Sequence, residues 1–549
     1  MSADETQEAA AASASAGLLV IAPPGCGKTE LLALRAQALV PRLLPGQKIL
    51  ALTFTNRAKA NLSQRLRQAL GVQRMRRYVT VRNFHGHAAE IVLAHGRTIG
   101  LKVDEIAMPS TNTLKKVLLQ FSGDSSARDA AEDLLAAIKR EPLSDEDVIE
   151  AIKAAGDTLA LQVEIQRIES DQLHYDDLLR HAQRLLRIGE VARLYQQHYG
   201  AVLVDEYQDL SLQQLDLAMS SCTASRTFAG DPLQGIYSWA GAAPREVDET
   251  LRLTCGDPVQ LTVSYRSSPA VLAMVNSISA RMGAAPLRAH DPAAWPGGGA
   301  SAALDFNTPA GEAEFVADVC GRITLADPAA SIGVIARAAW RRGAIDAALA
   351  QRPSVLCRRW DLAVEDPVVA DLIRNAVAGM PRGTKLDEAR DKVIATLDAA
   401  DVDTIEQVNE AIAQLNQAMP GATARAALAA LREQDPEAAI GPGVHLLNAH
   451  TGKGQQFDWV FACGLEEGHL PSKRNSAGSA LDEEQRVLLV ILSRARHGLI
   501  VTRSAHLNGK FGPYRATPSR WWDTVAASST LDRLALERQL QTLYPPRID

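Results

Sequence analysis

A short loop between an apolar run and a helical segment constrains the fold of this chain more than any other feature. The apolar run is LLVI at residues 18–21, the loop is APPGCGKT at 22–29, and the helical segment follows at 30–40. Glycines let a loop wrap around a small anion, and the N–H groups at the start of a helix point toward it with a favourable dipole. The pattern predicts a parallel α/β sheet with a phosphate-binding loop.

The loop residues have distinct expected roles. Lys28 is expected to reach the β- and γ-phosphates of a nucleoside triphosphate, and the Thr29 hydroxyl is expected to bind Mg²⁺. Ala22 stands where the strict pattern has glycine. The predicted nucleotide-binding residues of this segment are Ala22, Pro23, Gly25, Cys26, Gly27, Lys28, Thr29 and Glu30.

A second apolar run, VLV at residues 202–204, ends in two adjacent carboxylates, Asp205 and Glu206. Buried parallel strands have apolar residues on both faces and carry their functional groups at the carboxyl end. Asp205 is expected to hold Mg²⁺, and Glu206 to orient or deprotonate an attacking water. The alternative is a strand followed by a solvated acidic turn. The phosphate-binding loop upstream favours the catalytic interpretation.

Composition limits the class of protein. The length of 549 residues predicts roughly three to four domains. No apolar run is long enough to span a bilayer, and the first 17 residues lack the basic and apolar regions of a signal peptide. The six cysteines are scattered without a CxxC pair, which argues against zinc and iron–sulfur sites. We therefore expect a cytoplasmic protein that does not bind membranes.

The net charge of −6 gives no overall attraction to nucleic acid, but it leaves room for a local basic groove. One stretch is rich in arginine and contains Arg65, Arg67, Arg74, Arg76, Arg77 and Arg82. Phe84 and His85 follow it directly, and basic residues beside aromatic ones suit a track for single-stranded nucleic acid. The alternative for such a stretch is a solvated helix face.

The order of the motifs is more specific than any one of them. Along the chain stand ILALTFTNRAKA (49–60), VTVRNFHGH (79–87), YDDLL (175–179), VLVDEYQD (202–209), FAGDPLQGIYSWAG (228–241), QLTVSYRSS (260–268), VHLLNAHTGKGQQFDWVFACGLEEGHLP (444–471) and EQRVLLVILSRAR (484–496). In this order, and with the phosphate-binding loop before them, they resemble the UvrD/Rep/PcrA family of superfamily 1 DNA helicases.

The resemblance implies an α/β fold with two RecA-like P-loop NTPase domains, each a parallel sheet flanked by helices, with ATP bound between them. We expect the first domain at 1–96 and 172–255, with a helical insert at 97–171. We expect the second domain at 256–362 and 441–549, with a reduced helical insert at 363–440. Apolar residues at three- and four-residue spacing in both inserts also predict helices.

The same resemblance assigns further ATP-site residues. Gln7 matches the glutamine that binds the adenine, Tyr265 would stack on the adenine, and Arg266 would contact the γ-phosphate. Gln234 resembles the residue that senses the γ-phosphate, and Arg494 resembles the arginine finger of the second domain. Such an arginine stabilises phosphoryl charge only when both domains meet, so hydrolysis would depend on closure.

A DNA track is also implied by the resemblance. Thr55 and Asn56 match residues that contact the DNA backbone, and His450 and Lys453 would connect the track to the ATP site. The residues that match base-contacting positions are Phe84, His85, Tyr237 and Trp239. The alternative for each aromatic residue is core packing, and for His450 a structural role.

Three positions depart from the family pattern. Gly454 is followed by Gln455 and Gln456 where the family has Leu-Glu, so a ribose hydroxyl would be bound by Gln456 without charge assistance. Ala240 stands where the third motif commonly has arginine, and Asn83 stands where threonine is common. None of the three removes a catalytic group.

These patterns predict an ATP- and Mg²⁺-dependent helicase that moves on single-stranded DNA from 3′ to 5′ in DNA repair or replication restart. Its expected partners are single-stranded or tailed duplex DNA and a separate nuclease or repair protein. One alternative is a UvrD-like ATPase subunit of an anti-phage defence system that acts with a separate nuclease. Another is a nucleotide-sensing, DNA-binding scaffold with little hydrolysis.

Overall fold

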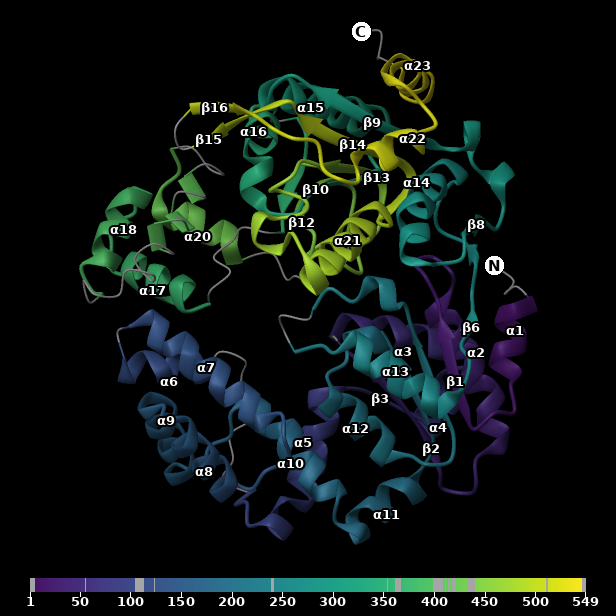
Figure 1. The fold of residues 1–549 in the computed structure, drawn as a ribbon, viewed down its shortest axis with the longest axis vertical. Helices are drawn as coiled ribbons and strands as arrows, with labels where there is room; N and C mark the ends of the chain where they lie inside the picture. Colours follow the sequence, from purple (N-terminus) through teal and green to yellow (C-terminus); the bar gives the residue numbers. More distant parts are fainter. Residues whose placement is uncertain are drawn as a thin grey trace.

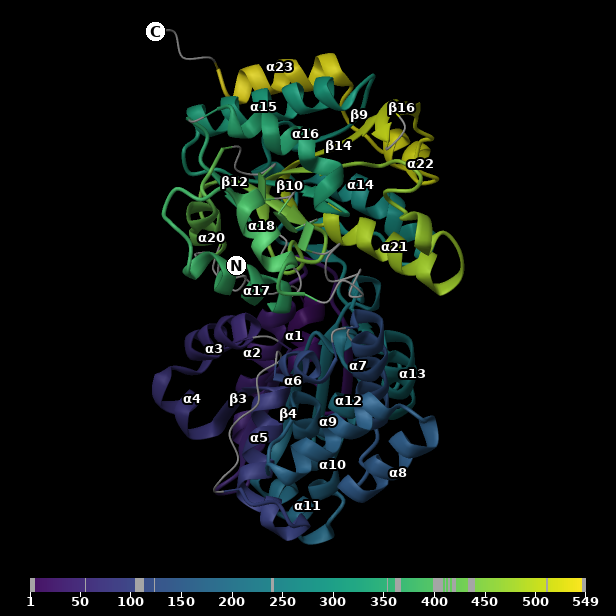
Figure 2. The same ribbon diagram turned by 90° about the vertical axis from the view of Figure 1, so that its left-hand side faces the viewer.

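Two parallel sheets dominate the computed structural model, one in each half of the chain (Figure 1). Turned by 90°, the first domain lies below the second (Figure 2). The structure describes residues 5–54, 56–103, 113–122, 124–237, 241–352, 354–360, 367–397, 408–409, 411–412, 415–416, 421–432, 440–509 and 512–545. The prediction of two α/β domains with parallel sheets and flanking helices is confirmed.

The first sheet has the strand order β3-β2-β4-β5-β1-β6, and its neighbouring strands run parallel. Its strands are β1 (Gly17–Ile21), β2 (Lys48–Thr53), β3 (Val79–Asn83), β4 (Tyr199–Asp205), β5 (Arg226–Gly230) and β6 (Val259–Gln260). β4 lies between β2 and β5, so the predicted acidic strand end is in the centre of the sheet. β6 pairs with Val20 and Ile21, so the first sheet extends a few residues past the boundary expected at 255.

The second sheet has the order β11-β12-β10-β13-β14-β9 and is also parallel. Its strands are β9 (Ala300–Phe306), β10 (Ser331–Ala336), β11 (Cys357–Arg359), β12 (Gly443–Asn448), β13 (Phe457–Cys463) and β14 (Ala495–Ser504). Two small pairs accompany the sheets: β7 (Val263–Ser264) with β8 (Arg288–Ala289), and β15 (His506–Gly509) with β16 (Gly512–Arg515).

Helices cover both faces of each sheet. Those of the first domain and its insert are α1 (Glu5–Ala12), α2 (Lys28–Leu39), α3 (Asn56–Leu70), α4 (Val72–Tyr78), α5 (Phe84–His95), α6 (Thr113–Phe121), α7 (Ser125–Lys139), α8 (Asp145–Ala155), α9 (Thr158–Glu169), α10 (Tyr175–Leu186), α11 (Gly189–His198), α12 (Leu212–Ser221) and α13 (Pro244–Cys255). Those that follow are α14 (Pro269–Ser279), α15 (Pro309–Ala326), α16 (Ala339–Ala350), α17 (Pro367–Ala378), α18 (Leu386–Ile394), α20 (Ala424–Arg432), α21 (Gly478–Leu492), α22 (Trp522–Ala527) and α23 (Arg533–Leu543). In the described part of the chain, no helix has the length and apolar character needed to cross a membrane.

One apolar core runs through both domains. It contains Val20 and Leu31 from β1 and α2 together with Val460 and Val487 from β13 and α21. Separate cores fill the other face of each sheet. Burial of apolar side chains is the main favourable term in folding, so a shared core gives the two sheets a preferred relative position.

The first insert is tied to its domain by buried charges. Lys139 Nζ lies 2.7 Å from Glu164 Oε2 and 3.0 Å from Asp177 Oδ2. Arg180 Nη2 lies 2.7 Å from Asp177 Oδ1, and Arg167 Nε lies 2.8 Å from Glu164 Oε1. Burial opposes ionisation of Asp177, but the nearby cations outweigh it and hold its pKa well below the usual range. These ion pairs join α7 and α9 to α10.

We predict that Arg180→Met lowers the free energy of unfolding of the first domain by about 3–5 kcal/mol, because it leaves the buried Asp177 carboxylate short of a counter-charge. The measurement is the midpoint of denaturant unfolding. Arg187→Met is the matched control, because Arg187 ends the same helix and is exposed. Equal midpoints for the two variants would contradict a stabilising role for Arg180.

Candidate functional site

The predicted phosphate-binding loop lies between β1 and α2, and other residues approach two of its glycines closely. Gly25 and Gly27 have φ angles of +82° and +80°. A Cβ atom on Gly25 would lie 2.5 Å from Arg266 Cβ, and one on Gly27 would lie 2.5 Å from Gln7 Nε2. Gln7 Nε2 also donates a 2.7 Å hydrogen bond to the Gly27 carbonyl oxygen. Both positions therefore need glycine for backbone conformation and for space.

Lys28 lies between the two carboxylates at the end of β4. Its Nζ is 3.2 Å from Asp205 Oδ1 and also contacts Glu206 Oε2. Burial disfavours the charged ammonium, but the attraction of both carboxylates outweighs it and raises the pKa of Lys28. Burial also opposes ionisation of Glu206, yet Lys28 and Lys453 lower its pKa to about 2. Glu206 is therefore anionic at neutral pH.

The backbone of Glu206 is strained. Its φ is +57°, and within the described residues Asp171 is the other non-glycine residue in this region. Gln208 Nε2 donates to Glu206 Oε2 at 2.7 Å, and Gln208 Oε1 accepts from Asp231 N at 3.0 Å. A left-handed conformation costs energy in a residue with a side chain and is often found at functional sites. Gln208 thus holds the Glu206 carboxylate at the strand end.

Two arginines at the site bind no carboxylate among the described residues. Arg494 is buried and donates to neutral oxygens, including Gln234 Oε1 at 3.0 Å and the Val490 carbonyl at 2.8 Å. Arg266 Nη1 is shielded from solvent and has no hydrogen-bond partner in the part of the chain that the structure describes. Burial lowers the pKa of Arg494 to about 9 and that of Arg266 to about 10, so both remain cationic at neutral pH. Their positive charge fits an anionic ligand such as a triphosphate.

Lys453 joins the two domains beside this pair of arginines. Its Nζ lies 2.5 Å from Asp209 Oδ1 and donates to the Gln234 carbonyl oxygen at 2.7 Å. The ammonium also lies 4.5 Å from the ring centroid of Tyr237. Burial raises the pKa of Asp209 to about 6, although Lys453 opposes this. Asp209, Gln234 and Tyr237 belong to the first domain, so a single lysine of the second domain contacts all three.

The predicted ATP-site residues gather around one cavity of about 1040 Å³ between the domains. Those that line it are Gln7, Ala22, Pro23, Gly25, Gly27, Lys28, Thr29, Glu30, Asp205, Glu206, Gln234, Tyr265, Arg266, Gly454, Gln456 and Arg494, together with Tyr237 and His450 from the predicted DNA set. Cys26 is 1% exposed and does not line the cavity.

Several lining residues were not predicted from the sequence. On α3 these are Ala58, Asn61, Gln64 and Gln68, beside Arg65, which the sequence suggested for nucleic acid and not for this cavity; elsewhere they include Pro24, Phe54, Asp209, Thr451, Gln455 and Arg496. From Asn61 onward, the α3 residues follow i, i+3, i+4, i+7 spacing, which places them on one helix face. This periodicity was a usable signal, but the sequence alone does not tell a solvated polar face from one that lines a cavity.

The cavity also suits Mg²⁺ bound together with phosphates. Thr29 and Asp205 both line it and supply hydroxyl and carboxylate oxygens, the ligands that Mg²⁺ prefers. The described residues hold no group of three or more acidic, histidine or cysteine side chains that could bind a metal ion by itself. Mg²⁺ commonly takes one or two protein ligands and completes its shell with substrate phosphates and water, so the two residues fit such an ion.

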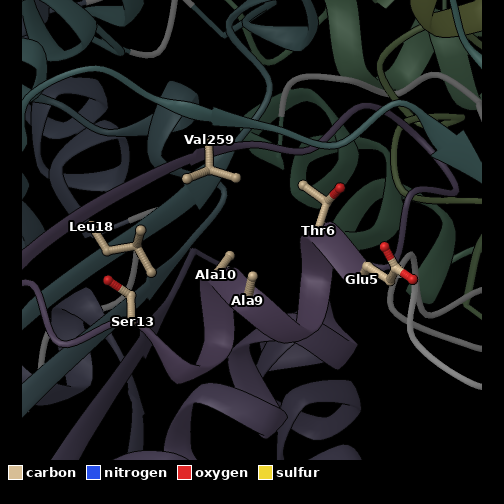
Figure 3. A pocket seen from close by; sticks show the side chains of 7 residues that line it. All are labelled: Glu5, Thr6, Ala9, Ala10, Ser13, Leu18 and Val259. Atoms are coloured by element: carbon tan, nitrogen blue, oxygen red, sulfur yellow. The ribbon is translucent and has the colours of Figure 1, made fainter.

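A smaller hollow of about 490 Å³ lies beside α1 and the edge strand β6 (Figure 3). Its lining residues are Glu5, Thr6, Ala9, Ala10, Ser13, Leu18 and Val259. None of the predicted site residues is among them. The chemistry predicted from the sequence is therefore concentrated in the larger cavity.

Three aromatic rings that line the larger cavity form a row. Tyr237 stacks on Phe54 with centroids 5.9 Å apart, and its centroid lies 6.2 Å from that of His450. Burial lowers the pKa of His450 to about 4, so its ring is neutral at physiological pH. The structure thus brings two of the predicted DNA-contacting residues together, next to the Lys453 bridge.

Two further predicted DNA contacts, His85 and Phe84, pack against other residues. His85 stacks on Tyr175 with centroids 3.9 Å apart. Phe84 is 1% exposed and packs in the core of the first domain, so its ring presents no face to a base. Thr55 and Trp239 lie outside the described residues. Asn56 begins α3, and its side chain also lies outside the described part.

The structure describes two of the three positions that depart from the family pattern. Asn83 caps α5 by accepting a 2.7 Å hydrogen bond from Gly86 N. Gln456 is exposed at the cavity wall, while the neighbouring Gln455 is buried. Ala240 lies outside the described residues.

The fold and the site define a two-domain protein with a nucleotide cavity between RecA-like sheets. Its sequence matches the models of the UvrD/REP helicase N-terminal domain over residues 3–252 and the UvrD-like helicase C-terminal domain over residues 385–506. The chain belongs to the UvrD-like helicase family.

Similar proteins carry related names. The chain is 26% identical to "ATP-dependent DNA helicase UvrD2" of Mycobacterium tuberculosis over 96% of its own length and 82% of that protein. It is 29% identical to "DNA helicase II" of Rickettsia typhi over 50% of its length and 44% of that protein. It is 30% identical to "ATP-dependent DNA helicase PcrA" of Leuconostoc citreum over 48% of its length and 37% of that protein.

We predict that Gly27→Ala weakens nucleotide binding by at least about tenfold. The new methyl group would lie 2.5 Å from Gln7 Nε2, closer than Cβ atoms approach other atoms in proteins, and an alanine at φ +80° is strained. Affinity for a fluorescent ATP analogue is the measurement. Gly283→Ala is the control, since Gly283 has φ +78° but a Cβ atom added there would have no neighbour within 4 Å. Equal affinities for the two variants would contradict the role of the Gln7 contact.

Proposed function

We propose that this protein is an ATP-dependent motor that moves from 3′ to 5′ along single-stranded DNA and separates duplex DNA during repair or replication restart. The observation that carries the proposal is the contact between Arg494 and Gln234, 3.0 Å apart at the nucleotide cavity and contributed by different domains. Family membership and the names of the relatives support the substrate class, and the motif resemblance supports the polarity.

The loop and the first residues of α2 would bind the phosphates. No side chain caps α2, so its first N–H groups are available to an anion. We assign the adenine to Gln7 and Tyr265 and the phosphates to Lys28 and the loop amides. Mg²⁺ held by Thr29 and Asp205 would neutralise charge on the phosphate oxygens.

Lys28 links ATP binding to the activation of Glu206. Its ammonium helps to hold the pKa of Glu206 at about 2, which is too low for an effective base at neutral pH. The phosphates of ATP compete for the same ammonium. When Lys28 turns toward them, Glu206 loses part of its stabilisation and its pKa rises. Glu206 then orients the attacking water and accepts its proton, while Gln208 keeps the carboxylate in place.

Arg494 and Lys453 connect the nucleotide cavity to the DNA track, because both bind Gln234. Arg494 and Arg266 supply positive charge where negative charge develops on the transferred phosphoryl group. Gln234 binds Arg494 through its side chain and Lys453 through its carbonyl oxygen. Lys453 in turn lies over Tyr237, the middle residue of the aromatic row. Loss of the γ-phosphate would weaken domain closure and change the grip on the strand, which produces stepping.

We predict that the wild-type protein unwinds a duplex with a 3′ single-stranded tail and leaves the matching duplex with a 5′ tail intact when ATP and Mg²⁺ are present. A strand-displacement assay with both substrates is the measurement, and a blunt duplex is the control. Displacement of the 5′-tailed substrate alone would contradict the polarity. ATP hydrolysis without stimulation by single-stranded DNA would contradict the motor itself.

We predict that Glu206→Gln lowers the kcat of DNA-stimulated ATP hydrolysis by at least about 100-fold, because an amide cannot accept the proton of the attacking water. Nucleotide affinity is expected to persist or increase, since the substitution removes a negative charge and one of the two carboxylates that contact Lys28. Steady-state turnover and analogue binding are measured on the same preparation. Wild-type turnover in this variant would disprove the role of Glu206.

A further inference from the structure

An aromatic cluster lies on the surface of the second domain, outside the nucleotide cavity. Trp340, in the first turn of α16, is 60% exposed, whereas Trp459, Trp521 and Trp522 are 9% exposed or less. The Trp340 ring lies 4.7 Å from the ring of His469. His469 Nε2 lies 3.3 Å from the hydroxyl oxygen of Tyr514, which is 43% exposed on β16. The cluster joins three segments far apart in the sequence.

Buried ion pairs fix two of these segments in place. Arg341, the residue after Trp340, has its Nη2 atom 2.6 Å from Glu466 Oε1 and 2.8 Å from Glu312 Oε2. Both glutamates are 0% exposed. Because Glu466 lies three residues before His469, the same network sets the backbone on both sides of the Trp340–His469 contact. A surface organised in advance loses little conformational freedom when a ligand stacks on it.

The chemistry of the cluster suits a base rather than a metal or an acidic side chain. Burial, aided by Arg341 and Lys473, lowers the pKa of His469 to about 4, so the aromatic surface is neutral at physiological pH. The exposed Lys473 is close enough to influence the pKa of His469, and the exposed Arg474 and Arg515 follow Lys473 and Tyr514 in the sequence. Neutral rings with a cationic border are what single-stranded nucleic acids bind, through stacking and phosphate attraction.

Charged residues near His450 lead along the chain toward the cluster. His450 lies close enough to Arg337 and Glu484 for both charges to influence its pKa. Arg337 Nη2 is 2.9 Å from Glu484 Oε1. Arg337 directly follows β10, and Trp340 comes three residues later in the first turn of α16. A strand that leaves Tyr237 and His450 across the second domain would therefore pass toward Trp340.

We propose that Trp340, backed by His469 and flanked by Tyr514, is a second base-stacking site that holds the part of the single strand lying on the second domain. The inference rests on the proposed function as a single-stranded DNA motor. The site accepts any base, because each base presents a flat aromatic face and nothing in the cluster distinguishes one hydrogen-bonding edge from another.

The test is binding of Trp340→Ala to oligothymidylates of increasing length, followed by fluorescence anisotropy. Long oligonucleotides are expected to bind this variant about 5- to 150-fold more weakly than they bind the wild type, which corresponds to the loss of one stacked base. Oligonucleotides short enough to occupy the first domain alone are expected to bind both proteins equally. Trp340→Phe should keep most of the affinity, and Tyr514→Ala should show the same dependence on length.

Leu325→Ala is the matched control, because Leu325 is 54% exposed on α15 and takes no part in the cluster. Wild-type affinity of Trp340→Ala for long oligonucleotides would overturn the stacking site while leaving the proposed function intact. An equal loss at every length would also overturn it, since that result indicates a general effect of the substitution. If the wild-type protein itself binds no single-stranded DNA, the proposed function fails and the stacking site fails with it.

Discussion

Three carboxylates at the end of β4 are the constraint on which the arrangement of the domains depends. Asp205 and Asp209 are each 4% exposed, and Glu206 lies between them in the sequence. Buried carboxylates are costly unless cations pair with them. Lys28 from α2 pairs with the first two, and Lys453 from the second domain pairs with Asp209. Lys28 belongs to the first domain and Lys453 to the second. The charges at one strand end therefore tie the position of the second sheet to that of the first.

The remaining charges make closure sensitive to the nucleotide. Arg266 and Arg494 bring two guanidinium groups to the cavity, and neither binds a carboxylate among the described residues. Holding two cations close together out of water is unfavourable, and the lowered pKa of Arg494 reflects both its burial and its neighbour Arg266. A bound triphosphate supplies the missing negative charge. A ligand that interacts better with the closed arrangement shifts the population toward it, so binding and hydrolysis can drive domain motion.

Sequence patterns succeeded where a local rule of backbone geometry applied, and they fell short where orientation depended on packing. The strand, glycine loop and helix at residues 18–40 have a local signature, and so does the apolar strand that ends at Asp205. Phe84 shows the limit, because its position in a motif does not tell whether an aromatic ring faces a groove or the core. The cavity-lining face of α3 and the exposed Trp340 had no sequence signal that separated them from an ordinary helix surface.

By itself, the sequence determined the class of fold, the glycine-containing loop between β1 and α2, the acidic end of β4 and the family. These follow from the order of short segments whose φ and ψ preferences and apolar periodicity are local properties. Only the tertiary structure decided that Arg494 meets Gln234, that Lys453 bridges Asp209 and Tyr237, and that Trp340 stands in solvent beside His469. The first of these contacts joins residues 260 positions apart. Such distances depend on how two sheets and their shared core pack, and no local pattern encodes that packing.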